Sequence, residues 1–291
     1  MIRQSTKRSK PPVAGLLAVL TFAPLVPPAL AQTQPQLGDG VDRLSVHLSD
    51  PTRPGAVKVS LLNGSIAVKS YDGKDINIEA RPREELTGRT EEARPGLHRF
   101  SVGTTGLTAD EENNEVRIST DSLFRTVDLT LTVPAHTSLW LRSVNAGSIS
   151  VTGGDGDLDI SVVNGAVTLS DISGSTVAHT INGPLNATFA HLNPAKPVAF
   201  SSINGQLDVT FPPDVKANLL LHAARGGVFS DFDLQFQDSS SQSIREGSDS
   251  GAKYHIRFGG GVHATINGGG ADIQLSNFNG NIYIHKAGGG H

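Results

Sequence analysis

The chain has 291 residues, of which 32 are glycine, 18% are charged, 5% are aromatic and none is cysteine. Glycine makes up about 11% of the chain against a usual ~7%, which favours an architecture with many tight corners over one of long helices. The absence of cysteine excludes a disulfide framework, an iron–sulfur centre, a thiolate zinc site and a cysteine nucleophile. The length permits one or two domains with a sizeable core.

The first 31 residues have the order of an export signal. Residues 1–10 carry four basic and no acidic side chains, residues 13–26 are an apolar run, and Ala29, Leu30 and Ala31 follow. This order predicts a secretory signal peptide that is cleaved after Ala31. A membrane anchor is the alternative, disfavoured because the run contains Pro24 and is shorter than the ~20 residues of a span. We therefore expect an extracytoplasmic protein, periplasmic or secreted, with no membrane span after cleavage.

Loss of the signal makes the chain more acidic. The full chain has 24 basic and 28 acidic residues, and without the four basic residues of the signal the formal charge becomes −8. A nucleic-acid binder needs a basic face to displace counterions from phosphate, and anionic lipid headgroups repel an acidic surface. The charge balance therefore argues against a nucleic-acid partner and favours a protein or glycan partner.

After a polar linker at 32–40, the chain alternates apolar and polar residues, which is the period of half-buried strands. The clearest strands are expected at 46–48, 57–61, 76–78 and 127–133. The charge-dense segment 81–94 alternates arginine with glutamate and contains proline and glycine, so we expect a solvated loop or a short polar helix there.

An internal repeat is the most informative feature of the sequence. Its core is Asn-Gly followed by a variable residue and then an apolar one. Strict copies begin at Asn63, Asn164, Asn182, Asn204 and Asn279, and looser copies at Asn145 and Asn267. From Asn145 the asparagines follow at intervals of 19, 18 and 22 residues. A period of ~20 residues is typical of stacked, solenoid-like architectures.

A series of β-hairpins is the simpler reading of Asn-Gly between strands. In a two-residue hairpin the residue before asparagine would share a face with the second residue after it, yet the former is always apolar and the latter mostly polar. A corner that keeps the apolar residues of both flanking strands facing inward fits better. We therefore predict an all-β fold, a β-solenoid or right-handed β-helix-like stack of short strands with Asn-Gly corners; a β-sandwich or meander is the alternative.

The corner residues have physical reasons to recur. Asparagine tolerates a left-handed backbone, and its amide can bond to the next asparagine in a stack. Glycine takes positive φ without a Cβ clash. The asparagines are therefore expected to be structural and not catalytic.

Several segments together resemble a known family. They are Val133-Pro134, the Gly/Asp run 153–157, the segment 226–232 and the glycine-rich segment 259–270. With the signal peptide and the repeat, they resemble the bacterial putative-adhesin domain family from about Val41 to Lys286. The resemblance implies an extracytoplasmic β-strand repeat domain of largely uncharacterised function, and it supplies no catalytic residues.

No catalytic, cofactor-binding or metal-binding residues are predicted. Asp155, Asp157 and Asp159 are similar to a calcium-binding Gly/Asp repeat, but Leu158 and the single copy make a solvated acidic turn the default. The position four after each strict asparagine, expected to face outward, shows no pair of carboxylates for acid–base chemistry; it holds Ala67, Thr168, Asn186, Asp208 and Tyr283. The ten histidines form none of the usual metal or triad motifs.

These observations predict a signal peptide at 1–31, a polar linker at 32–40 and a β-repeat domain at 41–286. A loop insertion is expected near 231–254, and a flexible tail at 287–291. The preferred function is an exported, non-enzymatic binding, adhesion-type or structural module of the bacterial cell envelope or secretome. The alternative is a glycan-active enzyme, a polysaccharide lyase or hydrolase on the same scaffold. No cofactor is expected, and the ligand, the oligomeric state and the coil handedness stay open.

Overall fold

The computed structural model describes residues 41–83, 105–120, 126–237, 244–245, 254–256 and 261–288. These residues form 21 strands and no helix, and hydrogen bonding connects all the strands into one open sheet. The expectation of an all-β fold is confirmed. The predicted signal peptide and linker, and most of the charge-dense segment 81–94, lie outside the described residues. Within the described residues, no helix is long and apolar enough to cross a membrane.

The strands of the first half surround two long ones. They are β1 (Asp42–His47), β2 (Ala56–Asn63), β3 (Ile66–Tyr71), β4 (Asp75–Pro82), β5 (Leu107–Glu112), β6 (Glu115–Thr120), β7 (Val127–Pro134), β8 (Ser138–Thr152) and β9 (Leu158–Ile172). The second half consists of shorter strands. They are β10 (Thr176–Asn182), β11 (Leu185–Phe189), β12 (Val198–Asn204), β13 (Leu207–Phe211), β14 (Ala217–Ala223), β15 (Val228–Ser230), β16 (Gln235–Gln237), β17 (Ile244–Arg245), β18 (Tyr254–Ile256), β19 (Val262–Ile266), β20 (Ala271–Asn279) and β21 (Ile282–Lys286).

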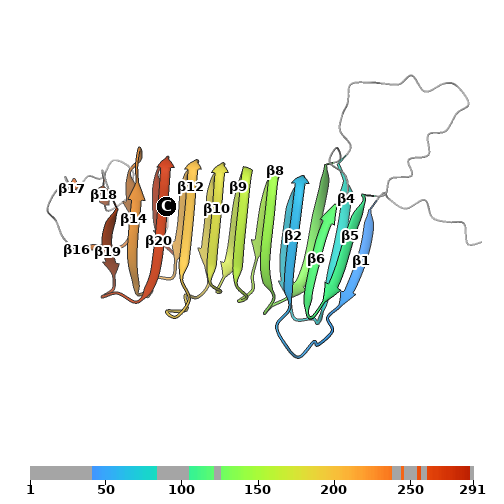
Figure 1. The fold of residues 1–291 in the computed structure, drawn as a ribbon. Coiled ribbons are helices and arrows are strands. Elements are labelled where there is room, and N and C mark those ends of the chain that lie inside the picture. Colours follow the sequence, from blue (N-terminus) through green and yellow to red (C-terminus); the bar gives the residue numbers. More distant parts are fainter. Residues whose placement is uncertain are drawn as a thin grey trace, which may run out of the picture. The chain divides into compact units, whose positions relative to one another are not determined.

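The strands before and after the Asn corners form two parallel series, which we name face A and face B. Face A, which is toward the viewer in Figure 1, contains β2, the first half of β8, the first half of β9, β10, β12, β20 and β14. Face B contains β3, the second halves of β8 and β9, β11, β13, β21 and β15. A strand of face A pairs with equivalent strands of other repeats and not with the strand that follows its own corner. The hairpin alternative is therefore wrong for these corners.

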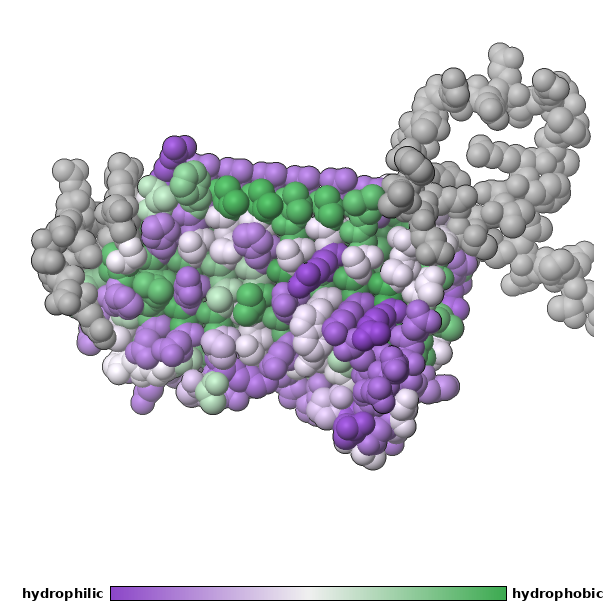
Figure 2. All heavy atoms as spheres, viewed as in Figure 1, coloured by the Kyte–Doolittle hydropathy of each residue, from purple (hydrophilic) through white to green (hydrophobic). Residues whose placement is uncertain are grey.

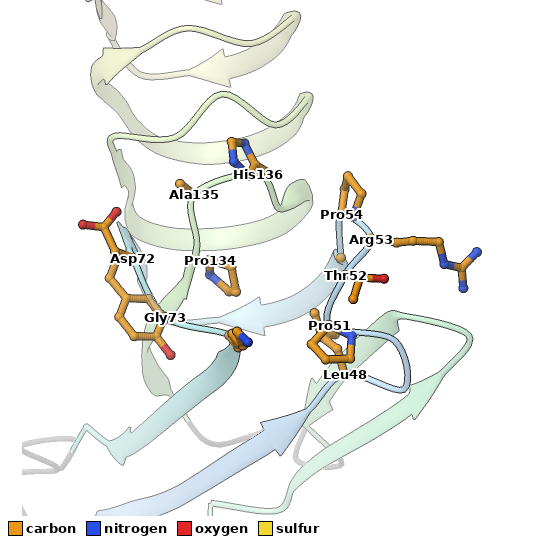
Figure 3. A pocket seen from close by; sticks show the side chains of 13 residues that line it. Leu48, Pro51, Thr52, Arg53, Pro54, Asp72, Gly73, Pro134, Ala135 and His136 are labelled. Atoms are coloured by element: carbon orange, nitrogen blue, oxygen red, sulfur yellow. The ribbon is translucent and has the colours of Figure 1, made fainter.

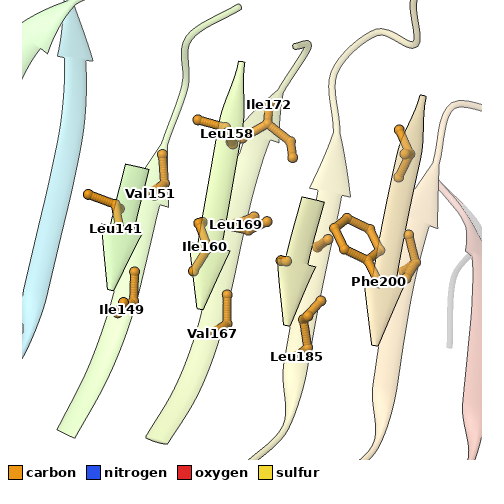
Figure 4. Packing of buried hydrophobic residues seen from close by; sticks show 14 of the residues in the cluster. Leu141, Ile149, Val151, Leu158, Ile160, Val167, Leu169, Ile172, Leu185 and Phe200 are labelled. Atoms are coloured by element: carbon orange, nitrogen blue, oxygen red, sulfur yellow. The ribbon is translucent and has the colours of Figure 1, made fainter. Parts of the chain in front are cut away.

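Alternation along each strand builds the core between the two faces. Inward residues on face A, such as Leu141 and Ile160, point toward inward residues on face B, such as Val151 and Leu169 (Figure 4). The ring of Phe189 lies 6.1 Å from that of Phe200 and 5.2 Å from that of Phe211. Because each inward side chain is buried by the repeats on either side, the apolar surface of one repeat is covered only by its neighbours.

The apolar residue before each corner asparagine does not face inward, contrary to expectation. Leu62 is 37% exposed, Val144 40%, Ile203 39% and Phe278 46%. Val163 and Ile181 are half-buried at the same position. The last inward residue of each face A strand lies one position earlier, as Leu61 and Val162 do. The period of two then directs the next side chain outward.

Close approach of stacked backbones explains the corner glycines. A Cβ on Gly183 would lie 2.1 Å from the Gly165 carbonyl oxygen, and a Cβ on Gly205 would lie 2.0 Å from that of Gly183. The left-handed backbone expected for asparagine is found at Asn267 and not at the corners in register. Among the described residues, the others with positive φ, glycine aside, are Asn113, Asn114 and Asp171.

Antiparallel strands lie at both ends of the parallel series. At one end β6 pairs in parallel with β2, and β7 with β3; β5 then pairs antiparallel with β6, β4 with β7, and β1 with β4. At the other end β19 and β16 follow β14, and β18 and β17 follow β15. The last repeat of the chain, β20 and β21, lies between β12–β13 and β14–β15. Asn267 is not at a repeat corner but in the turn between β19 and β20.

Candidate functional site

A ladder of six asparagine amides runs along the corner between the two faces. Each Nδ2 donates to the Oδ1 of the asparagine in the neighbouring repeat. The successive distances are 3.0 Å (Asn145 to Asn63), 3.1 Å (Asn164 to Asn145), 2.7 Å (Asn182 to Asn164), 2.8 Å (Asn204 to Asn182) and 2.8 Å (Asn279 to Asn204). The expected amide-to-amide bonding is confirmed. Because the ladder uses a donor and an acceptor of each inner amide, it serves structure first.

Beside the ladder on face A runs the row that we name the apolar stripe. It consists of Leu62, Val144, Val163, Ile181, Ile203 and Phe278. Figure 2 shows a line of apolar side chains directly beside a line of hydrophilic ones along one edge of this face. The guanidinium carbon of Arg225 lies 5.1 Å from the centre of the Phe278 ring, at one end of the stripe.

Face B presents two rows of small polar side chains, which we name the polar rows. Cα partners join Ser150 to Thr168, Thr168 to Asn186 and Asn186 to Asp208 in the first row. The second row holds Thr152, Ser170, Thr188 and Thr210 two residues further along the same strands, and a bulge in β9 shifts the register between Ser170 and Thr188. The residues of the expected outward column, Ala67, Thr168, Asn186, Asp208 and Tyr283, are half-buried and in register, with Ser150 of β8 between Ala67 and Thr168.

A cluster of rings and carboxylates adjoins the polar rows. The Tyr283 ring lies 5.0 Å from that of Phe229 and 6.1 Å from that of His285. His285 Nδ1 is 3.0 Å from Asp231 Oδ2, and its Nε2 is 3.7 Å from Asp208 Oδ1. The sequence reasoning missed the approach of Asp231, because it comes from a different repeat 54 residues from His285.

A shallow pocket of about 340 Å³ lies away from both surfaces, between the ends of strands near Leu48, Tyr71 and Pro134. Figure 3 shows Arg53 and Asp72 on opposite sides of it, pointing away from one another. His136 of its lining pairs with Asp155 through a 2.7 Å contact. Because Arg53 and Asp72 point apart and His136 already pairs with Asp155, the described lining offers no acid–base pair.

The three aspartates of the acidic turn that resembles a calcium-binding repeat have different partners and do not form one site. Asp155 pairs with His136, and Asp157 Oδ1 lies 2.6 Å from Lys196 Nζ. Asp159 sits on β9 with Trp140 as its partner on β8. Across the described parts of the chain, no group of three or more acidic or histidine side chains is placed to hold a metal ion.

Ion pairs concentrate beyond the N-terminal end of the stack. A hydrogen bond from Lys58 lowers the pKa of Glu115, against a smaller effect of desolvation, and Arg117 lowers it further. Burial opposes ionisation of Asp128, but bonds from Ser65 and Arg83 outweigh it, so that the pKa of this carboxyl falls below its ordinary value. The Lys58–Glu115 pair joins β2 to β6, and Asp128 on β7 binds Arg83, which follows β4, and Ser65, which precedes β3.

Comparisons with known proteins give structural likeness only. No protein-family model and no curated protein matches the chain. A putative cell adhesion protein from Clostridium sporogenes ATCC 15579 matches with a TM-score of 0.42 and 10% identity over 84% of this chain and 99% of the other. A putative adhesin from Bacteroides fragilis NCTC 9343 matches with a TM-score of 0.32 and 12% identity over 84% and 96%. Both are described as adhesins, as the resemblance of the repeat predicts, but likeness of this strength says nothing about what the chain binds.

Proposed function

We propose that the chain is an exported, non-enzymatic, adhesion-type module of the cell envelope or secretome, built as a β-solenoid-like stack from 41 to 286. The observation that carries the proposal is the register of the polar rows. Thr168 on β9, Asn186 on β11 and Asp208 on β13 are successive Cα partners, so their side chains repeat at the ~4.8 Å spacing of hydrogen-bonded strands. A repeating surface suits a repeating ligand.

The ligand chemistry that fits the polar rows is a neutral glycan chain. Hydroxyl and amide groups both donate to and accept from sugar hydroxyls, and a carboxylate such as that of Asp208 accepts from them. The formal charge of the mature chain is negative, which disfavours an anionic polymer. A protein partner is the other outcome of the test, since flat polar faces also bind proteins.

The experiment is binding of the purified mature chain, residues 32–291, to a panel of bacterial and host glycans, followed by calorimetry. We expect Thr168→Val and Thr188→Val together to weaken binding at least tenfold, because each removes a hydroxyl without changing the side-chain shape. The matched control is Ser161→Ala, an outward hydroxyl on face A. Binding that is unchanged in the double variant, or lost in the control, would contradict the assignment of the polar rows.

A glycan-active enzyme is the second candidate, favoured by the two carboxylates Asp208 and Asp231 on either side of His285. Glycosidases use a pair of carboxyl groups flanking the scissile bond. Incubation of the mature chain with polysaccharides should produce new reducing ends or unsaturated products if this candidate is right. Such products, and their loss in Asp231→Asn, would replace the binding proposal.

Export and the domain layout belong to the same proposal. Expression of residues 1–291 in a bacterial host should yield an extracytoplasmic product that lacks residues 1–31. Intact mass of the product measures the cleavage site. A product that stays in the cytoplasm with its N-terminus intact would contradict the export proposal while leaving the fold untouched.

A further inference from the structure

The apolar stripe is an unusual feature for a surface row. Four of its six members, Leu62, Val144, Ile203 and Phe278, are more than one third exposed. They lie on adjacent strands of face A, so the stripe is continuous over six strands. Contiguous exposed apolar side chains with polar neighbours mark interaction surfaces, whereas single ones do not. The asparagine ladder on one side and a row rich in serine on the other provide that polar border.

We propose that the apolar stripe is the contact surface between two copies of this chain, related by a two-fold axis along the strands so that the two stripes run antiparallel. Such an interface uses the same patch on both copies, which a two-fold axis requires. The pairs that meet are then Leu62 with Phe278, Val144 with Ile203 and Val163 with Ile181 of the second copy, each occurring twice.

The gradient of side-chain size along the stripe favours this direction. The order is leucine, two valines, two isoleucines and phenylalanine from β2 to β20. Antiparallel stripes place every valine opposite an isoleucine, and the leucine opposite the phenylalanine, so the combined height of the opposed side chains stays nearly even. Parallel stripes would place valine on valine and phenylalanine on phenylalanine. The first arrangement packs without gaps or clashes, and both gaps and clashes are destabilising.

The charges of the adjoining row are compatible with the antiparallel direction. That row holds Ser60, Arg142, Ser161, His179, Ser201 and Ser276, which are Cα partners from strand to strand. In the antiparallel arrangement Arg142 lies opposite Ser201, and His179 opposite Ser161, of the second copy. Each basic side chain of the row therefore faces a serine, and no like charges are directly opposed.

The area sets the expected strength. Six strands at ~4.8 Å and two rows of side chains cover about 29 by 14 Å, or roughly 400 Å² on each copy. The total of ~800 Å² is below the ~1,200–2,000 Å² of stable specific complexes. We therefore expect a reversible dimer that forms at high protein concentration or where the copies are held close together.

Sedimentation velocity of the mature chain from micromolar to millimolar concentration tests the interface. We expect a monomer that converts to a dimer as concentration rises, and at least tenfold weaker dimerisation in Ile203→Arg. The matched control is Leu44→Arg, which changes a side chain that is 43% exposed on β1, outside the stripe. Circular dichroism verifies that both variants are folded. A chain that is monomeric at all concentrations, or a dimer that survives Ile203→Arg, would overturn the proposal.

The lack of cysteine allows the direction to be tested separately. Leu62→Cys and Phe278→Cys are each prepared alone and then mixed under mild oxidation. Antiparallel stripes predict a disulfide between the two variants in the mixture and almost none within either variant alone, because Leu62 then lies far from Leu62 of the second copy. Efficient cross-linking of Leu62→Cys with itself would show parallel stripes and overturn the arrangement.

Discussion

The central repeats and the strands beyond their N-terminal end are joined by different forces. Between β8 and β13 the corners are linked by neutral amides, such as that of Asn182, and buried aromatic rings such as Phe200 pack in the core. From β1 to β7 parallel and antiparallel pairings are mixed, and charged pairs such as Lys58–Glu115 and Arg83–Asp128 join the strands. All the carboxyl groups with a clearly lowered pKa lie in this second region, at Asp50, Glu111, Glu115 and Asp128, within the part of the chain that the structure describes.

This contrast shows how repetition restricts chemistry. A row of identical residues in register must tolerate its own copy about 4.8 Å away, which like charges do not. Asparagine can donate to one neighbour and accept from the other, so it repeats indefinitely. Charged residues therefore occur singly within the repeats, as Arg142 does on β8, or as opposite charges placed together, as in Lys58–Glu115.

The largest expected effect lies in the corners of the central region. In Gly205→Ala the new Cβ would lie 2.0 Å from the Gly183 carbonyl oxygen, so the stacked backbones must separate. We expect a loss of ~5 kcal/mol in the free energy of unfolding, or failure to fold. Urea denaturation measures it. Gly261→Ala is the matched control, because its nearest contact is the Leu220 side chain at 3.5 Å; equal losses in both would contradict the close-approach explanation.

The core of the central region should give the next effect. Phe200 is 1% exposed and packs on Phe189. Phe200→Ala should lower the free energy of unfolding by about 3–5 kcal/mol, because it removes apolar contacts and leaves a cavity. The control is Phe278→Ala, at a 46% exposed position, measured at a protein concentration that keeps the chain monomeric. An equal loss of unfolding free energy in both variants would contradict the assignment of Phe200 to the core.

The ladder should give a smaller effect. Asn182 donates to Asn164 and accepts from Asn204, so Asn182→Ala removes two hydrogen bonds. At ~1 kcal/mol each, we expect a loss of about 2 kcal/mol by thermal or urea unfolding. Asn186→Ala, which lies outward on the next strand of the same repeat, should cost less. A ladder substitution without effect on stability would assign the asparagines a role other than cohesion.

The smallest effect should appear in the N-terminal region as pH falls. Because the pKa values of Glu115 and Asp128 are lowered in the folded chain, their contribution is present above the ordinary carboxyl pKa of ~4 and is lost as pH falls through the lowered values. Hydrogen exchange at acidic and neutral pH should show faster exchange in β4, β6 and β7 at acidic pH, and little change in β10–β13. High salt should act in the same direction. An equal increase in exchange rate in both regions would contradict the claim that only the N-terminal region depends on charged pairs.

Much of the fold follows from local pattern. Alternation predicted the strands at 57–61 and 127–133, and the mismatch around Asn-Gly excluded hairpins correctly. The amide ladder followed from the fact that identical residues in register meet. The outward direction of Leu62 and Phe278 could not be predicted. An apolar side chain next to a corner can point inward or outward, and the sequence pattern alone does not distinguish the two.

Long-range placement is what local pattern could not supply. Asn267-Gly268 matches the corner motif in sequence, but it is not a repeat corner. Ile266 before it is 0% exposed, and the Asn267 amide donates to the Val215 carbonyl. Nothing near Asp231 indicates that it meets His285, since the two belong to different repeats. Both facts depend on the order in which the repeats lie side by side, and the spacing of the repeats along the sequence does not show that order.

The position of β20 and β21 between β12–β13 and β14–β15 has a consequence for how the chain is completed. Synthesis delivers residues 198–230 before residues 271–286 exist, so the stack cannot grow simply from one end to the other. β12 and β14 can pair with β20 only after residues 271–279 have been synthesised. Until then each has an unpaired edge that can recruit another chain. If synthesis stops before residue 271, the strands β12, β13, β14 and β15 each lack one partner, and these edges stay open to other chains.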